Sequence, residues 1–340
     1  MSVQDESVQA SAKIDPNEIS VIDIGPVLAG APRAVEQAAS QFHAACTGMG
    51  FLFLVNHGID PEIVARTFEV SRRFFALPPE EKLKVRMNRH QCGYMPPNVS
   101  VHRDTFEARE TAKTPQASEA FKFTFDLTPD DPDYGKGRRF RGHNKWPDET
   151  TVPGLRTAFI DFHVTFEAFA RKLLAPLSVS LDLPPAHFDP HFERSSSMTR
   201  IACYPRVAEE TEVISLPGHL DLSFLSLIPP ATKPGLEILT PSGEWIEQPV
   251  VPEGLLFNTG ITLRNWSNHV YKATPHRVRK DTEGDRHSNI FFLYPNVDAR
   301  MECLPTCVGP DNPAQYAPIT FGEFHADYAA RNFSYAEDWD

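Results

Sequence analysis

Cysteine is scarce in this chain: its 340 residues include only five, scattered along the length and odd in number. A disulfide framework needs paired cysteines, so it is excluded as the basis of the fold. Cys303 and Cys307 lie four residues apart, but no second pair of Cys or His residues completes a zinc site, and we expect both to be structural. So few cysteines favour a reducing compartment, and we expect a cytoplasmic location.

Long apolar runs and long basic runs are also missing. No stretch approaches the roughly 20 apolar residues of a membrane span, and the polar, acidic N-terminus lacks the basic and apolar regions of a secretory signal. The formal net charge is −12, from 33 Lys and Arg against 45 Asp and Glu. Phosphate backbones select clustered positive charge, so we expect neither nucleic acid nor a membrane as partner. The sequence does not indicate an oligomeric state.

What is present is a hydrophobic content of 41%, ample for a large core. Residues 1–18 are polar and without periodicity, and we expect them to be disordered. Residues 19–150 alternate predicted strands, at 19–24 and 51–55, with amphipathic helices. We expect residues 151–340 to form the main core, and residues 19–150 and 151–340 to build one compact unit.

The second half changes from a helical pattern to a strand pattern. A long helix is predicted over 155–181 from a stripe of large apolar residues, with Pro176 as a kink near its end. From about residue 199 short strands follow, punctuated by Pro and Gly, and they predict an all-β sandwich, jelly roll or barrel. The strands are expected at 200–204, 219–228, 236–239, 245–246, 254–258 and 288–293, and a last helix at 321–331.

His219, Asp221 and His276 are the most informative residues. In a strand, side chains at i and i+2 point to the same face, so His219 and Asp221 should project together. His276 lies later in the chain, before another predicted strand. Two imidazoles and one carboxylate are the ligand set of the facial triad that holds non-heme Fe(II) and leaves coordination positions open for oxygen chemistry. The three residues are therefore candidate metal ligands and the candidate catalytic centre.

Arg286 and Ser288 form a second constellation. In the strand register that begins there, both side chains share a face. A guanidinium and a hydroxyl that point into one cavity suit a carboxylate, which accepts a bidentate fork and one more hydrogen bond.

A structural interpretation competes with each of these residues taken alone. A single histidine in a strand is usually a satisfied core or surface residue, and an isolated Arg-x-Ser is usually solvated. The order and spacing of all five residues, each near a predicted strand, favour the functional interpretation.

Residues 98–118 are polar, weakly periodic and too long for a simple connector. Long loops without secondary structure are often lids or binding loops. We expect substrate contacts from Arg103, Phe106 and Arg109 in this loop, and from Phe121 and Phe123 just after it, although for each loop residue a solvated position is the commoner outcome.

The motifs resemble those of the Fe(II)/2-oxoglutarate-dependent dioxygenases of the isopenicillin N synthase-like group, over nearly the whole chain. The resemblance lies in residues 50–59 (GFLFLVNHGI), 74–78 (FFALP), 93–94 (GY) and 144–147 (NKWP), then in 265–268 (NWSN), 272–278 (KATPHRV) and 286–288 (RHS). It implies an α+β protein with a double-stranded β-helix (jelly-roll) core buttressed by N-terminal and C-terminal helices.

By this resemblance His219, Asp221 and His276 would bind Fe(II), and Arg286 and Ser288 would hold the distal carboxylate of 2-oxoglutarate. Tyr204, just before Pro205, matches a tyrosine that often supports the co-substrate. One position departs from the pattern. Plant members commonly have asparagine two residues before that tyrosine, and this chain has Ala202, for which Arg200 on the same strand face is a candidate replacement.

The resemblance implies an oxygenase that uses Fe(II), 2-oxoglutarate and O2 to hydroxylate a small-molecule C–H bond and releases succinate and CO2. Desaturation and ring closure stay open as outcomes. Two alternatives also stay open: an iron oxidase of the isopenicillin N synthase type that needs no 2-oxo acid, and a jelly-roll binding protein without turnover. No motif names the substrate.

Overall fold

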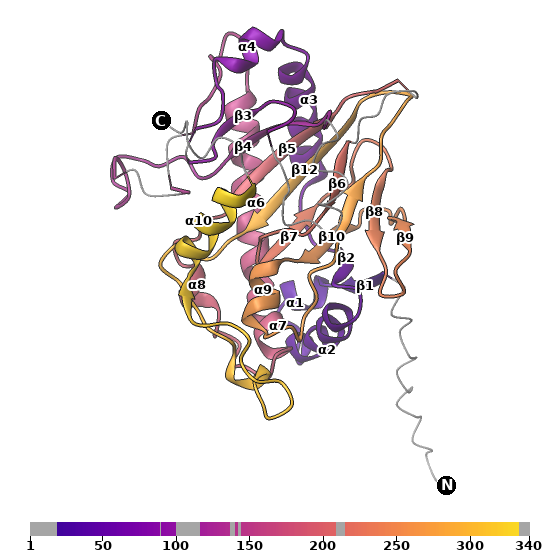
Figure 1. The fold of residues 1–340 in the computed structure, drawn as a ribbon, viewed down its shortest axis with the longest axis vertical. Coiled ribbons are helices and arrows are strands. Elements are labelled where there is room, and N and C mark those ends of the chain that lie inside the picture. Colours follow the sequence, from indigo (N-terminus) through magenta and orange to yellow (C-terminus); the bar gives the residue numbers. More distant parts are fainter. Residues whose placement is uncertain are drawn as a thin grey trace.

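Two facing β-sheets form the centre of the computed structural model, which describes residues 19–88, 90–99, 116–136, 140–141, 144–208 and 215–332 (Figure 1). Within these residues the larger sheet has eight strands, in the order β1 (Ser20–Asp23), β2 (Phe51–Val55), β10 (Leu255–Thr259), β7 (Leu225–Ile228), β12 (Arg286–Leu293), β5 (Met198–Tyr204), β4 (Glu119–Phe123) and β3 (Gly93–Met95). The smaller sheet has the order β6 (Leu216–His219), β11 (His276–Val278), β8 (Leu236–Leu239) and β9 (Trp245–Glu247).

The two sheets form the jelly-roll core that the family resemblance implied. Apart from the parallel pair β1 and β2, neighbouring strands in these sheets run antiparallel. Strands from residues 19–150 and strands from the second half share the larger sheet, although the division at residue 150 stays a prediction. A short ribbon, β13 (Arg300–Met301) with β14 (Ile319–Thr320), lies outside both sheets.

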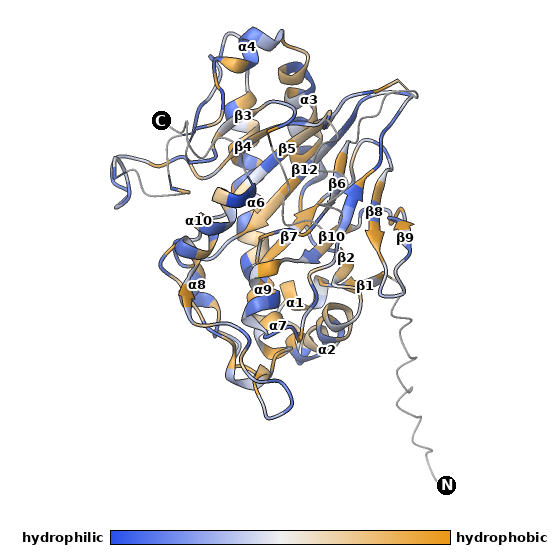
Figure 2. Ribbon diagram, in the orientation of Figure 1, coloured by the Kyte–Doolittle hydropathy of each residue, from blue (hydrophilic) through white to orange (hydrophobic). Residues whose placement is uncertain are grey.

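Helices pack around the two sheets (Figure 1). They are α1 (Gly25–Leu28), α2 (Ala34–Thr47), α3 (Pro61–Phe75), α4 (Pro79–Leu83), α6 (Leu155–Lys172), α7 (Leu174–Val179), α8 (Asp189–Phe192), α9 (Ile261–Trp266) and α10 (Phe321–Asn332), with a 3₁₀ turn, η1 (Pro305–Cys307). Figure 2 shows apolar residues along the central strands and mixed faces on the helices, as expected where one helix face is buried. Within the described residues, no helix has the length and apolar character needed to cross a membrane.

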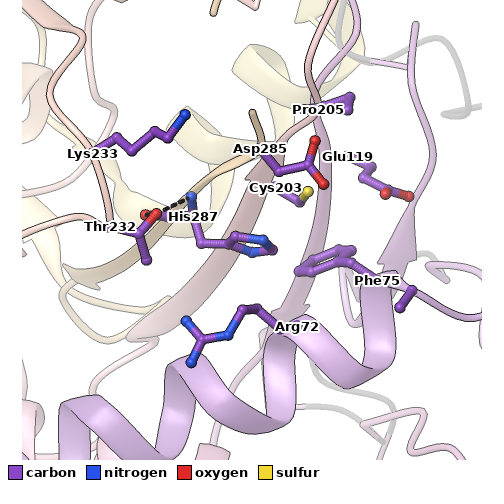
Figure 3. A pocket seen from close by; sticks show the side chains of 10 residues that line it. Arg72, Phe75, Glu119, Cys203, Pro205, Thr232, Lys233, Asp285 and His287 are labelled. Carbon is purple, nitrogen blue, oxygen red and sulfur yellow. Dashed lines mark hydrogen bonds between the residues drawn. The ribbon is translucent and has the colours of Figure 1, made fainter. Parts of the chain in front are cut away.

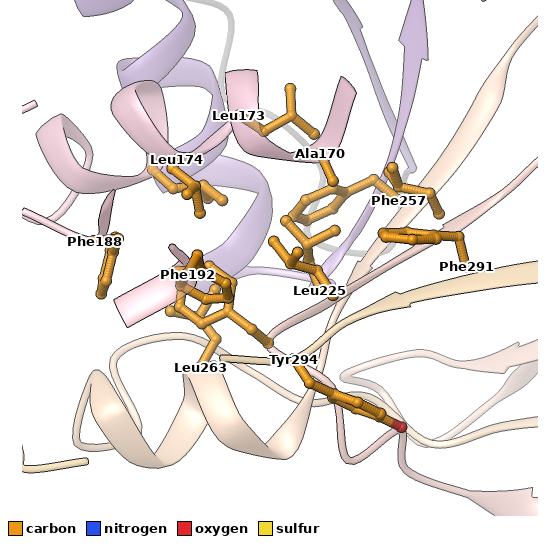
Figure 4. Packing of buried hydrophobic residues seen from close by; sticks show 14 of the residues in the cluster. Ala170, Leu173, Leu174, Phe188, Phe192, Leu225, Phe257, Leu263, Phe291 and Tyr294 are labelled. Carbon is orange, nitrogen blue, oxygen red and sulfur yellow. The ribbon is translucent and has the colours of Figure 1, made fainter. Parts of the chain in front are cut away.

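The aromatic stripe of the long predicted helix is core, as expected. Phe159, Phe162 and Phe166 are fully buried, and Figure 4 shows the neighbouring cluster in which α6 and α7 pack on β7, β10 and β12. The single helix over 155–181 is corrected to two, α6 and α7, which meet at Leu173. Pro176 explains the break, because proline lacks an N–H and its ring clashes with the carbonyl four residues earlier.

The predicted strand over 219–228 is also corrected. β6 ends at His219 and β7 begins at Leu225, and the two strands belong to different sheets. The intervening chain is held by backbone bonds to α9, where Ile261 N donates to Asp221 O at 2.7 Å. Gly260 permits this approach, since a Cβ there would lie 2.0 Å from the carbonyl oxygen of Ser223. The chain therefore changes sheets at the point where Asp221 lies.

Candidate metal centre and its adjoining cavities

The strands of the smaller sheet bring the two predicted histidines face to face. His219 is the last residue of β6, His276 is the first of β11, and they are direct partners in the antiparallel register. Their ring centroids are 4.3 Å apart. Asp221 lies just beyond β6, with its Oδ1 at 3.8 Å from His219 Nε2 and 3.6 Å from His276 Nε2. All three side chains are buried, and one donor atom from each lies within 4.8 Å of the others.

Backbone and side-chain partners orient these three donors. Nδ1 of His219 lies 3.0 Å from the carbonyl oxygen of Pro217, and Nδ1 of His276 lies 3.1 Å from that of Thr274. A carbonyl only accepts, so Nδ1 of each ring carries the proton and Nε2 keeps a lone pair for a metal.

The carboxylate of Asp221 is fixed in the same manner. Its Oδ2 accepts hydrogen bonds from Ser226 Oγ at 2.6 Å and Asn258 Nδ2 at 2.8 Å. Ser226 and Asn258 are cross-strand partners on β7 and β10. Residues of the larger sheet therefore orient the carboxylate near the two histidines of the smaller sheet. Oδ1 is left to face the two imidazoles. The donor set and its orientation fit a divalent cation.

The charges of the trio fit a cation too. Burial would raise the pKa of Asp221, but the two imidazoles and the Ser226 hydroxyl hold it well below its usual range. Burial and the neighbouring His276 lower the pKa of His219 to about 3, so this imidazole is neutral. Burial would also lower the pKa of His276, but Asp221 raises it above its usual value. Metal binding requires the neutral form of His276, so metal affinity at this site should depend on pH.

A cavity beside the trio contains the second predicted constellation. Arg286 and Ser288 on β12 and Tyr204 on β5 line a cavity of about 30 Å³ together with His219, Asp221 and His276. Arg286 is 4% exposed, and burial lowers its pKa. Its Nε donates to the carbonyl oxygen of Lys233, its guanidinium lies 5.2 Å from the centre of the Tyr204 ring, and its Nη1 has no hydrogen-bond partner among the described residues.

Ala202, the departure from the family pattern, is fully buried opposite Ser288 in the register of β5 and β12. Arg200, two residues earlier on the same face, lines this cavity and the next one. Its part as a replacement for the missing asparagine stays a prediction.

Within the described residues, none of those predicted to contact substrate is seen at the site. Arg103, Phe106 and Arg109 lie outside the described residues. Phe121 and Phe123 are corrected: both are fully buried in the cluster around Phe159 and Trp146, on the outer face of β4. Strand alternation instead turns Lys122 inward, opposite Arg200 in the register. A lysine between two phenylalanines in a strand was the signal that could have identified it.

Lys122 contributes to a cavity of about 70 Å³ that also reaches the trio. This cavity, which we call the inner basic cavity, is lined by residues from β3, β4, β5, β12, α10 and the segment that holds Asp221; they are Gln91, Met95, Lys122, Met198, Arg200, His219, Leu220, Asp221, Leu222, Phe292, Tyr294, His325 and Tyr328. Sequence reasoning missed Gln91 and Lys122, along with Ser226 and Asn258.

A second cluster of ligand-type side chains lies on the outer face of the same strands. Cys203 and His287 are cross-strand partners on β5 and β12, and Asp285 precedes β12. They line a cavity of about 520 Å³ beside α3 (Figure 3). Arg72, Lys233 and Glu119 line the same cavity, so it contains charges of both signs.

The chain belongs to the 2OG-Fe(II) oxygenase superfamily. The family model "non-haem dioxygenase in morphine synthesis N-terminal" matches residues 19–149, and the model "2OG-Fe(II) oxygenase superfamily" matches residues 195–295. Such enzymes use Fe(II) and 2-oxoglutarate, and the protein is a 2-oxoglutarate-dependent oxygenase that acts on small molecules.

The comparisons also give individual proteins to which this chain is similar. Kihadalactone A synthase LFS of Citrus sinensis is 30% identical over 85% of this chain and 86% of its own length. The 2-oxoglutarate-Fe(II) type oxidoreductase hxnY of Emericella nidulans is 28% identical over 90% and 87%. In fold, the chain is similar to a full-length Neurospora crassa protein crystallised in complex with alpha-KG, with a TM-score of 0.80, 23% identity, and 95% and 99% of the two chains covered. These relatives favour neither the oxidase without 2-oxoglutarate nor the inactive binding protein.

Proposed function

We propose that His219, Asp221 and His276 bind the Fe(II) of this oxygenase. The observation that carries the proposal is the orientation of the trio: both Nδ1 atoms face carbonyl oxygens, both Nε2 atoms face Asp221 Oδ1, and Oδ2 is held by the larger sheet. Two neutral imidazoles and one carboxylate leave an iron site with open positions for co-substrate and oxygen.

Arg286, with Ser288 and Tyr204, would hold the distal carboxylate of 2-oxoglutarate. A buried guanidinium with an unused Nη1 donor, in a cavity that also contains the trio, supports this role. A charge-assisted contact of this kind is worth about 1.5–3 kcal/mol. The ring of Tyr204 keeps the guanidinium in place from the β5 side.

When bound, the metal and the oxo acid supply the oxidising chemistry, which yields succinate and CO2. The chain's own residues position the reactants and exclude water. Phe51 packs edge-on against His276, with ring centroids 5.4 Å apart, and Ile228, Leu236 and Val278 close the co-substrate cavity. No side chain is needed as acid or base, so the absence of such a group among the described residues beside the trio is no objection to this reaction.

The substrate is proposed to be a small molecule whose C–H bond is hydroxylated, with desaturation and ring closure as open variants. The Neurospora crassa protein of similar fold has also been crystallised with thymine, which supports a compact substrate for this fold. The loop residues Arg103 and Phe106 remain proposed contacts. A cytoplasmic location fits five cysteines that are all free.

Anaerobic addition of Fe(II) and then 2-oxoglutarate tests these roles. Chelation by the oxo acid should produce a visible metal-to-ligand charge-transfer band, and His219→Ala should show none. On admission of O2, slow succinate release is expected even without substrate. Absence of the band in the wild-type protein, or turnover that needs no 2-oxoglutarate, would overturn the proposal.

A further inference from the structure

The inner basic cavity holds two buried basic side chains beside the metal trio. Lys122 and Arg200 are 7% and 8% exposed, and they face each other across β4 and β5. Among the described residues that line this cavity, Asp221 is the only acid, and its two oxygens are committed to the trio and to Ser226 and Asn258.

Bound Fe(II) and 2-oxoglutarate would not balance the positive charge of Arg200. Fe(II) carries two positive charges, against which Asp221 sets one negative charge and 2-oxoglutarate two. Arg286 supplies one more positive charge, so this set is neutral. Arg200 then remains in the adjoining space as a buried cation. Buried charge is normally balanced by opposite charge, and an anionic ligand in this cavity would balance Arg200.

Two buried donors also lack acceptors. Arg200 Nε and Gln91 Nε2 have no hydrogen-bond partner within the described parts of the chain, and Gln91 is only 2% exposed. An unsatisfied buried donor is costly. A carboxylate accepts several hydrogen bonds at once and could serve both donors as well as the Lys122 ammonium.

The pKa of Lys122 points the same way. Burial, and then the charge of Arg200, lower it to about 7. An anion between the two would restore the full charge of the lysine, since an opposite charge at close range favours the ionised form.

Much of the remaining lining of the cavity is apolar or aromatic. The rings of Phe292 and Tyr294 are parallel within 3° at a centroid distance of 6.0 Å, and Met95 and Met198 line the same space. This surface suits the hydrocarbon part of a ligand.

We propose that the substrate is a small carboxylic acid whose anionic group is held by Lys122, Arg200 and Gln91. Its apolar part lies along Phe292 and Tyr294, which places a C–H bond beside His219 and Asp221. This inference rests on the proposed function, because it assigns a substrate class to that site.

Matched pairs of probes test it: acetate with acetamide, phenylacetate with phenylacetamide, and hexanoate with hexanamide. Each is titrated anaerobically into protein saturated with Fe(II) and 2-oxoglutarate, and its dissociation constant is read from the shift of the charge-transfer band and from thermal stability. We expect at least one acid to bind about tenfold or more tightly than its amide. Lys122→Met should remove that preference, and Lys122→Arg should keep it.

Lys84→Met is the matched control, since Lys84 is an exposed lysine paired with Glu81, and it should leave the preference intact. Arg200→Met should likewise weaken the acid. If it weakens 2-oxoglutarate instead, Arg200 belongs to the co-substrate and its part in the proposal is overturned. A panel in which no acid outbinds its amide, whether both bind or neither does, overturns the whole inference. Failure of the proposed function differs from either result, because the band would then be missing before any probe is added.

Discussion

Two clusters among the described residues gather three ligand-type side chains at similar spacing, but they differ in how their donor atoms are oriented. In each, the donor atoms lie within 4.8 Å of one another. At His219, Asp221 and His276, other atoms fix which donor faces inward. Close spacing is therefore a weak indicator of a site, and the partners that orient the donors are a strong one.

The outer cluster has less of this support. Asp285 is exposed and accepts from the backbone N–H of Arg206 at 2.8 Å. His287 Nδ1 has no hydrogen-bond partner in the described structure. Burial, with Glu119 and Asp285 nearby, raises the pKa of Cys203 to about 12, so the thiol stays protonated and is a poor ligand.

The largest expected effect comes from replacing the acid of each cluster, Asp221 or Asp285, with alanine. Asp221→Ala should lower retained iron to background and succinate release by more than about a thousandfold, because a metal ligand is lost outright. Asp285→Ala should change neither by more than about twofold. Iron per chain, measured after anaerobic reconstitution and desalting, decides between them. Equal losses of iron in both variants would show that the two clusters do not differ in metal binding.

Strand alternation explains how much of this could be predicted. The two-residue period placed Arg286 and Ser288 on one face, and both line the co-substrate cavity. The same rule also applied to Phe121 and Lys122, but which of them faces inward depends on the pairing of β4 with β5, residues about 80 positions away. Local pattern cannot supply that choice.

The end of the strand before Asp221 could not be predicted from the sequence, for a similar reason. Residues 219–228 have strand composition throughout, and the chain leaves the strand because Asn258 and Ile261, distant in sequence, bond to Asp221. Motif order predicted the ligands, whereas tertiary contacts set their orientation.

The next effect in size belongs to the co-substrate. Arg286→Met keeps much of the side-chain volume but removes the guanidinium, so the KM for 2-oxoglutarate should rise by roughly tenfold to a hundredfold, equivalent to about 1.5–3 kcal/mol. Arg279→Met is the control, because Arg279 is half exposed and pairs with Glu247. Steady-state succinate release at varied 2-oxoglutarate measures both. An unchanged KM would remove Arg286 from the co-substrate site.

A smaller effect should come from the residue that orients Asp221. Ser226→Ala removes one of two hydrogen bonds to Oδ2 and leaves Asn258 in place. Loss of such an outer partner typically costs tenfold or more in metal affinity, and we expect about tenfold here. Competition for Fe(II) with a chelator of known affinity gives the value. Thr232→Ser, at the outer cluster, is the control and should keep the Fe(II) affinity of the wild type. If Ser226→Ala also keeps it, the orientation of Asp221 does not explain the difference between the two clusters.

The smallest effect should follow changes at the outer cluster itself. Cys203→Ser replaces a protonated thiol with a hydroxyl of similar size, and His287 projects away from the iron cavity on the opposite face of β12. Iron affinity and the KM for 2-oxoglutarate should therefore stay within about twofold of wild type, because neither side chain touches the trio or Arg286. Reconstitution with Co(II) sharpens the comparison, since a thiolate ligand would add a near-ultraviolet charge-transfer band that the His-Asp-His site cannot produce. A band lost in Cys203→Ser but kept in Cys92→Ser would show that the outer cluster binds metal after all, and the argument from orientation would then be wrong.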